Sequence, residues 1–357
     1  MDFKNFVSSI LVFLVGYEIA LAHDSYTSSR PDGHAPISVM GDHVHKAGEW
    51  MASYRFMHMN MDGMRSGDSS LSASEVFMSD GGYTVTPEKM TMEMHMLGLM
   101  YAVSDRITLM AMANYTEIEM DHQINPMAQP LVNANSGSDQ FTTRSDGIGD
   151  TRVGALYQFY ENQNKRAHLG LAVSLPTGSI DETDFTPMPG MPPSFVDQDL
   201  PAPMQLGSGT FDLIPSITWL HQFEKASYGL QASGKIRMES ENDRGYQLGN
   251  VFEVIHWAAY APNSFLSFEG GLAYKHVGDL SGLQEGIGRM GPAGRSVTTA
   301  FNENYGGESL DLLIGLNFLF KNGHRLAIDL RAPVWEDLNG VQLETDYILT
   351  AGWQRAW

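Results

Sequence analysis

Methionine is the residue type whose spacing in this chain carries the most chemical information. The 357 residues include 22 Met and no Cys, and many Met in the first third alternate with other residues. Alternation places them on one face of an extended strand. The candidates for lining a lumen or binding a ligand are Met57, Met59, Met61, Met92, Met94, Met96, Met110 and Met112. Thioethers suit Cu(I) or Ag(I), hydrophobic solutes or plain packing, so the runs leave three uses open.

A short segment ahead of the first predicted strand holds the second set of candidate ligands. Its histidines include His34, His43 and His45, and the last two project to the same side of an extended chain, where they can share a metal ion. Two histidines one residue apart are weak evidence, because solvated or packed histidines are commoner. Calcium is a candidate at the extracellular loops, where residues 146–150 read DGIGD, although a turn ahead of a strand favours a structural role there.

Motifs for catalysis and nucleic-acid binding are missing from the sequence. It contains no GxSxG, HExxH or P-loop pattern. Asp and Glu number 42 against 22 Lys and Arg, and there is no basic stripe to bind phosphates. We therefore expect a protein that is not an enzyme, has no resident cofactor and binds no nucleic acid.

The elements that position these side chains are predicted to be β-strands. Period-two alternation between turn signals gives about twelve of them, within a range of about 10 to 14. Their approximate spans are 49–61, 89–103, 107–120, 150–160, 167–175, 210–221, 227–238, 246–260, 264–277, 309–320, 324–335 and 342–357. In hydrocarbon every backbone polar group must be paired within the protein. The predicted fold is therefore all-β: a transmembrane antiparallel up-and-down β-barrel over residues 49–357.

The two faces and the two ends of these strands differ in chemistry. Apolar residues such as Leu169 and Leu171 are expected to face lipid, and the Met runs have the opposite parity, so they should face the lumen. Five connections are short, and six longer ones alternate with them, which is typical of periplasmic turns and extracellular loops. The long loops are all acidic and hold nearly all of the net charge of −20. Such loops attract cations, bind divalent ions that bridge lipopolysaccharide, or simply stay solvated.

Both ends of the chain indicate export to the outer membrane. Residues 1–22 have a short basic start, an apolar stretch and an A-x-A site, which predicts a removed signal peptide. Residues 23–48 are expected in the periplasm or as a plug in the lower lumen. The last strand alternates and ends in an aromatic residue, as a sorting signal for the barrel-assembly machinery does, and Trp353 and Trp357 should face lipid. The predicted periplasmic aromatic girdle comprises Tyr101, Tyr157, Phe159, Trp219, Phe223, Tyr228, Trp257, Tyr260, Phe265, Phe320, Trp353 and Trp357.

Several motifs in order along the chain also resemble a known family. They are HAPISVMGDHVHKAGEWMASYRFM (34–57), MTMEMHMLGLMYAVSDRITLMAM (90–112), SDGIGD (145–150), SLPTGSID (174–181), MQLGSGTFDLIP (204–215) and LETDYILTAGWQRAW (343–357). From about residue 34 to the end the chain resembles proteobacterial outer-membrane proteins described as transporters, or as the meta-pathway phenol degradation family. The resemblance implies a barrel that passes aromatic or other hydrophobic compounds, and it supplies no binding residues. This chain ends in Trp357, where such barrels most often end in Phe.

Together these features predict an outer-membrane channel for passive passage of small solutes. The first alternative is a metal-handling barrel that binds copper-type or silver-type ions through its Met-lined lumen and its histidines. The second is a plugged structural or adhesive barrel. The expected partners are outer-membrane lipid, lipopolysaccharide, the barrel-assembly machinery and a small-molecule solute. Oligomeric state is left open by the sequence.

Overall fold

The computed structural model describes residues 26–189 and 194–357, so the predicted signal peptide lies outside the described residues. The strands of the wall are β1 (Trp50–Gly67), β3 (Tyr83–Ser104), β4 (Ile107–Ile124), β6 (Thr151–Asn162), β7 (Lys165–Leu175), β10 (Asp212–Gln222), β11 (Ala226–Arg237), β13 (Val251–Tyr260), β14 (Leu266–Val277), β18 (Gly307–Leu319) and β19 (His324–Ala356). Four more strands join this sheet outside the ring: β2 (Ser69–Leu71), β5 (Gln140–Ile148), β16 (Met290–Gly291) and β17 (Gly294–Val297).

Short elements make up much of the rest. Two small ladders pair β8 (Thr183–Pro187) with β9 (Phe195–Asp199), and β12 (Tyr246–Gln247) with β15 (Ser281–Gly282). The α-helices are α2 (Ala73–Met78) and α3 (Gln129–Ala134), and the 3-10 helices are η1 (Pro31–Gly33), η2 (Ser79–Gly81), η3 (Ala202–Met204), η4 (Thr298–Ala300) and η5 (Asn302–Asn304). Among the described residues, none of the helices has the length and apolar character needed to cross a membrane.

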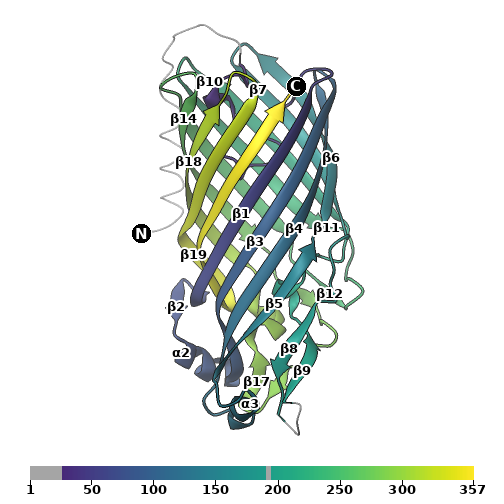
Figure 1. Ribbon diagram of the computed structural model, residues 1–357, viewed down its shortest axis with the longest axis vertical. Coiled ribbons are helices and arrows are strands. Elements are labelled where there is room, and N and C mark those ends of the chain that lie inside the picture. The colour runs from purple at the N-terminus through teal and green to yellow at the C-terminus, as the bar shows by residue number, and fades with distance from the viewer. Residues whose placement is uncertain (1–25, 190–193) are drawn as a thin grey trace.

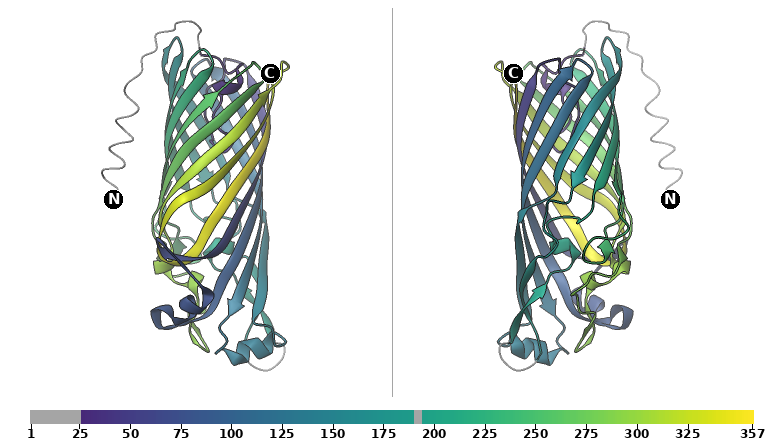
Figure 2. Two further views of the ribbon diagram at one scale, coloured as in Figure 1. Left: turned by 90° about the vertical axis from the view of Figure 1, so that its left-hand side faces the viewer. Right: turned by 90° about the vertical axis from the view of Figure 1, so that its right-hand side faces the viewer.

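The wall is a closed antiparallel β-barrel, as predicted (Figure 1). Its strands follow the order β3-β1-β19-β18-β14-β13-β11-β10-β7-β6-β4, and pairing of β3 with β4 closes the ring. Figure 2 shows the strands tilted around the barrel, with the C-terminus at the end that has short turns and the long loops extending beyond the wall at the other end. Closure leaves no free strand edge in the ring, which is the condition for a sheet to stand in hydrocarbon.

Strand β19 is a single element where the sequence predicted two strands, 324–335 and 342–357. Its first part, from Arg325 to Leu338, pairs with β18, and its second part, from Leu338 to Ala356, pairs with β1. The Ala356 amide also donates to the Gly323 carbonyl at 3.4 Å, so both ends of β19 lie at the same end of the barrel. The eleven strands therefore cross the wall as twelve segments, because the last one doubles back.

Four other predicted strands differ in extent from the observed ones. The spans 49–61 and 89–103 are the longer strands β1 and β3 in the structure. The span 246–260 begins as wall only at Val251, because 246–247 pairs with β15 in the loops. Strand β4 is longer than predicted: its outer half pairs with β5 and its inner half with β6. The DGIGD run therefore spans the end of β5 instead of forming a simple turn, and the Asp150 carboxylate accepts hydrogen bonds from the backbone of Gly178 and Ser208 at 3.0 and 2.9 Å. Calcium binding at these loops stays a prediction.

The outer surface follows the predicted alternation, with one exception among the girdle aromatics. Leu169, Leu171, Leu312 and Ile314 are about half exposed, as lipid-facing side chains are in an isolated barrel. Trp257 is wrong as a girdle residue: it is 1% exposed and lies inside the barrel. It shares the parity of the inward residues of β13, and Gly229 on β11 leaves room for its indole ring.

We expect Gly229→Ala to lower the free energy of unfolding by about 1–3 kcal/mol, the usual cost of overpacking a filled core. A Cβ atom at this position would lie 2.1 Å from the Trp257 ring. Urea unfolding in phospholipid vesicles measures the change. The matched control is Gly270→Ala on β14, where the nearest atom lies 3.8 Å away. Equal stability of the two variants would contradict this account of the Trp257 packing.

Candidate functional site

The N-terminal residues 26–49, here called the lumen segment, run through the periplasmic half of the barrel interior. Their backbone is hydrogen-bonded to inward side chains of strands spaced around the ring. The bonds join Arg55 Nε to the Ile37 carbonyl (3.0 Å), the Ser38 amide to Asp329 Oδ2 (2.8 Å), Gln231 Nε2 to the Met40 carbonyl (3.0 Å), His168 Nε2 to the Gly41 carbonyl (2.8 Å) and the His45 amide to Thr108 Oγ1 (3.0 Å). These bonds hold the lumen segment against the inner face of the wall.

Apolar packing fixes the same segment against one side of the lower lumen. Tyr26, Ala35 and Val39 of the segment form a buried cluster with inward residues of the wall. The wall members are Leu220, Ile255, Trp257 and Ala273. Burial raises the pKa of the Tyr26 hydroxyl, which donates to the Gly33 carbonyl at 2.5 Å. The lower lumen is therefore filled by ordered chain.

A cavity of about 390 Å³ lies above this filled region, in the middle of the barrel. Its floor is formed by residues 38–42 of the lumen segment. One wall consists of thioethers from β1, β3 and β4: Met51, Met57, Met94, Met96, Met100, Met110 and Met112. The strand register places these side by side, with Met57 opposite Met94 and Met100 opposite Met110. We call this space the lumen cavity.

The rest of the lumen cavity combines apolar side chains such as Leu156 and Ile255 with polar ones. Gln231 and Ser233 of β11, Glu253 of β13 and Arg331 of β19 contribute to it. Arg331 forms ion pairs with Glu253 at 2.7 Å and with the buried Asp311 at 2.5 Å. A molecule in the cavity therefore meets a soft apolar surface on one side and a mixed surface with hydrogen-bonding groups on the other.

The predicted Met set divides into two groups in the structure. Met57, Met94, Met96, Met110 and Met112 line the lumen cavity. Met61 and Met92 instead pack against a core that the extracellular loops form over the mouth of the barrel. This mouth core comprises Met64, Val76, Tyr83, Met90, Ile118, Met120, Leu200, Met204, Ala300, Phe301, Val341 and Leu343. Met59 is paired in register with Met92, next to the mouth core members of β1 and β3.

The loops enclose a second cavity, of about 780 Å³, which sequence reasoning missed. We call it the outer cavity, and its apolar lining includes Leu131, Phe141, Val196, Leu200, Ile287 and Val297. The His122 ring stacks on Phe141 with centroids 4.6 Å apart. Three buried polar atoms on its lining, His122 Nδ1, Thr143 Oγ1 and Ser296 Oγ, have no hydrogen-bond partner among the described residues. Buried polar atoms without partners usually mark a place where water or a ligand binds.

The mouth core separates the two cavities. Leu200 belongs to the mouth core and also lines the outer cavity. Ile287 and Val297 pack against the mouth core and line the outer cavity as well. On the lumen side Met92 packs against the core, and Met94, two residues further along the same face of β3, lines the lumen cavity. A solute that moves between the cavities must displace this apolar layer.

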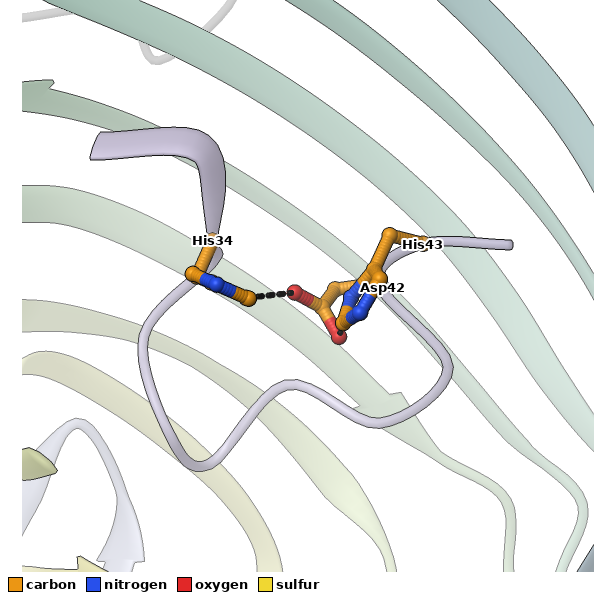
Figure 3. Close-up of side chains that lie close together, drawn as sticks. All are labelled: His34, Asp42 and His43. Atoms are coloured by element: carbon orange, nitrogen blue, oxygen red, sulfur yellow. Dashed lines mark ion pairs between the residues drawn. The ribbon is translucent and has the colours of Figure 1, made fainter. Parts of the chain in front are cut away.

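The structure brings together two of the three predicted metal-ligand histidines with a carboxylate that was not predicted (Figure 3). Candidate ligand atoms of His34, Asp42 and His43 all lie within 4.8 Å of one another, and all three residues are buried. Asp42 Oδ2 is 3.9 Å from His34 Nδ1, and Asp42 Oδ1 is 3.0 Å from His43 Nδ1. The third predicted residue, His45, lies outside this group, with its ring centroid 4.7 Å from that of His43.

Burial and neighbouring charges shift the pKa values of His34, Asp42 and the adjacent His45. Burial lowers the pKa of His34 well below its usual value and that of His45 to about 3, so both rings are neutral at pH 7. Burial by itself would raise the pKa of Asp42, but the facing His43 ring and Arg325 lower it well below its usual value. Neutral imidazoles and an ionised carboxylate are the forms that bind metal ions.

Comparison with known proteins shows the fold. An outer membrane channel from Pseudomonas putida F1 superposes with a TM-score of 0.58 at 14% identity, covering 90% of this chain and 100% of that chain. The toluene transporter from Ralstonia pickettii gives a TM-score of 0.46 at 12% identity, covering 87% of this chain and 90% of that chain. No family model matches the chain, and no curated protein is similar to it.

The closed antiparallel wall with its apolar exterior therefore has the fold of an outer-membrane β-barrel. Membership of the meta-pathway phenol degradation family stays a prediction. The sorting role of Trp353 and Trp357 also stays a prediction; Trp353 Nε1 donates to His324 Nδ1 at 2.9 Å, and Trp357 is 58% exposed.

Proposed function

We propose that this barrel is a passive channel for small solutes with an apolar body and one hydrogen-bonding group, such as simple phenols. The lumen cavity is the observation that carries the proposal. It has the size of a small-molecule site, and it combines a Met wall with the polar groups of Gln231 and Arg331. Thioethers adapt to different apolar shapes, which suits passage better than tight selection.

The two cavities define the proposed route. Solutes collect in the outer cavity, where His122 and Phe141 offer a stacking surface and unpaired polar atoms offer hydrogen bonds. They then cross the mouth core into the lumen cavity and leave past the lumen segment toward the periplasm. Because the mouth core contains only apolar side chains and Tyr83, an apolar solute crosses it at lower cost than a hydrated ion does.

Replacing three cavity thioethers by hydroxyls tests this function. In Met94→Thr/Met96→Thr/Met112→Thr we expect phenol entry into proteoliposomes to slow by about fivefold or more, since the solute loses part of its apolar contact. The matched control is Met78→Thr/Met127→Thr/Met238→Thr, which changes three methionines that are 74%, 71% and 60% exposed. Equal entry rates for the two triple variants would refute the proposed role of the Met wall.

The same thioethers favour a second candidate function, the handling of Cu(I) or Ag(I). Met57, Met94 and Met96 lie on one cavity wall, on adjacent positions of paired strands, and clustered thioethers suit soft ions. Silver titration of the first triple variant against the wild type tests this function. Loss of tight Ag(I) binding supports it, and unchanged binding removes it.

A further inference from the structure

We propose that His34, Asp42 and His43 form a binding site for one divalent first-row transition ion, such as Zn²⁺, in the floor of the lumen cavity. The site differs from the thioether wall in its ligands and in the ion it selects. Imidazole and carboxylate suit borderline ions of the Zn²⁺ type, whereas thioethers suit Cu(I) and Ag(I). Only its effect on passage, described below, rests on the proposed channel function.

The spacing of the ligand atoms is close to that of a metal centre. With Zn–N and Zn–O bonds of about 2.0–2.2 Å, two ligands of one tetrahedral ion lie about 3.3 Å apart. The His43 Nδ1 and Asp42 Oδ1 atoms are 3.0 Å apart, and His34 Nδ1 lies 3.9 Å from Asp42 Oδ2. The ligand atoms of the three residues all lie within 4.8 Å of one another, so side-chain rotations that draw them together would place one atom from each residue around one ion.

An unpaired nitrogen atom of His34 gives independent evidence for a cation. His34 Nε2 lies 2.9 Å from the Ser28 carbonyl, which only accepts hydrogen bonds, so Nε2 carries the proton and Nδ1 keeps its lone pair. That lone pair faces the Asp42 carboxylate inside the barrel. His34 Nδ1 is buried without a hydrogen-bond partner among the described residues, whereas His43 Nδ1 lies 3.0 Å from Asp42 Oδ1. A cation between these groups would satisfy all of them, and the bond from His34 Nε2 to a carbonyl is the usual support for a metal-ligating imidazole.

His45 lies beside this group, with its ring centroid 4.7 Å from that of His43. Its Nε2 is also buried and without a partner in the described chain. Arg325, whose guanidinium donates to the Ala35 carbonyl at 2.5 Å, opposes a further positive charge. The Asp42 carboxylate itself lies near that guanidinium and offsets part of its charge.

Binding of the ion would fasten the floor of the lumen cavity. The ligands come from the two ends of the loop 34–43, which Figure 3 shows folding back on itself. Residues 38–42 of that loop form the cavity floor, and Asp42 belongs to both the floor and the cluster. An ion held by both ends would close the loop as a chelate ring and make the lumen segment harder to displace.

Zinc titration of the intact barrel tests the site. The purified protein in detergent is stripped with a chelator and titrated with Zn²⁺ by calorimetry, and X-ray absorption reports the ligands. We expect one tight site per barrel with imidazole in its first shell, and at least a tenfold loss of affinity in Asp42→Asn and in His34→Asn/His43→Asn. Folding of each variant is judged by its heat-modifiable migration on gels. Asp42→Asn is nearly isosteric with the wild type, so its Zn²⁺ affinity decides the question if the double variant does not fold.

The control is His276→Asn, because His276 is exposed and lies 3.4 Å from Glu308 as a simple surface pair. It should leave the tight site unchanged. No tight binding to the wild type, or equal binding by the wild type and Asp42→Asn, would overturn the site. In planar bilayers Zn²⁺ should lower the conductance of the wild type and leave the conductance of Asp42→Asn unchanged. Tight Zn²⁺ binding with no fall in wild-type conductance would overturn the proposal that the ion fastens the cavity floor. The channel function itself is tested separately, by phenol entry.

Discussion

Deleting residues 27–46 is expected to raise the single-channel conductance in planar bilayers several-fold. The lumen segment fills the periplasmic half of the barrel and is hydrogen-bonded to β1, β4, β7, β11 and β19 around its circumference. Eight-stranded barrels are filled by their own side chains, and barrels of 16–18 strands leave an aqueous channel. A wall of twelve segments lies between these limits, so the space that the segment occupies becomes pore when the segment is removed.

A reversible tether provides the control for this deletion. The chain has no Cys, and a Cβ atom at Gly352 would lie 2.8 Å from Ile37 Cγ1, so Ile37→Cys/Gly352→Cys places two thiols within bonding reach. Oxidation should hold the conductance at its lowest level, and reduction should restore the wild-type level. If the deletion leaves conductance unchanged, the loops over the mouth limit the pore and the prediction is wrong.

Arg331→Met is expected to lower the free energy of unfolding by about 3–5 kcal/mol, since it leaves the buried Asp311 and the partly buried Glu253 without their cation. Arg331 contacts Glu253 at 2.7 Å and Asp311 at 2.5 Å, and Asp311 is 3% exposed. Urea unfolding in phospholipid vesicles measures the loss. The wall strands stay paired in this variant, so the cost comes from charge and not from a broken sheet.

Two further variants separate charge from packing in this network. Arg331→Met/Glu253→Gln/Asp311→Asn removes the unpaired charges and should recover most of the lost stability. Arg144→Met breaks the ion pair with Glu119 at 2.7 Å, but both side chains are exposed, so no measurable change is expected. If Arg331→Met and the triple variant lose the same free energy of unfolding, the cost comes from poor packing of the methionine in the lumen. That result would contradict the explanation by unpaired charge.

Much of the barrel could be predicted from local pattern. A strand alternates its side chains strictly, so Leu169 and Leu171 had to face lipid if Ser174 faced the lumen, and the Met runs had to face inward. Backbone pairing in hydrocarbon then required closure, and the short turns fixed which strands are neighbours. Trp257 could have been placed by the same parity; its position near a turn suggested the girdle instead.

The candidate sites could be predicted only in part, because they depend on contacts between distant segments. Alternation cannot tell that Met94 lines a cavity while Met92 supports a core, since that depends on how far the loops bearing Leu200 and Phe301 fold over the mouth. The outer cavity could not be predicted either, because loops that are far apart in the sequence form it together.

The sequence by itself therefore determined the barrel, its orientation and the inward direction of its methionines, because these follow from a period of two residues and from the solvent. The tertiary structure decided where empty space remains and which polar groups meet inside it. It turned the predicted pair His43 and His45 into a cluster of His34, Asp42 and His43, because the lumen segment loops back on itself instead of lying extended. Loop closure of this kind is stabilised by the surrounding wall, through contacts such as those of Arg55 and Asp329, which no local pattern encodes.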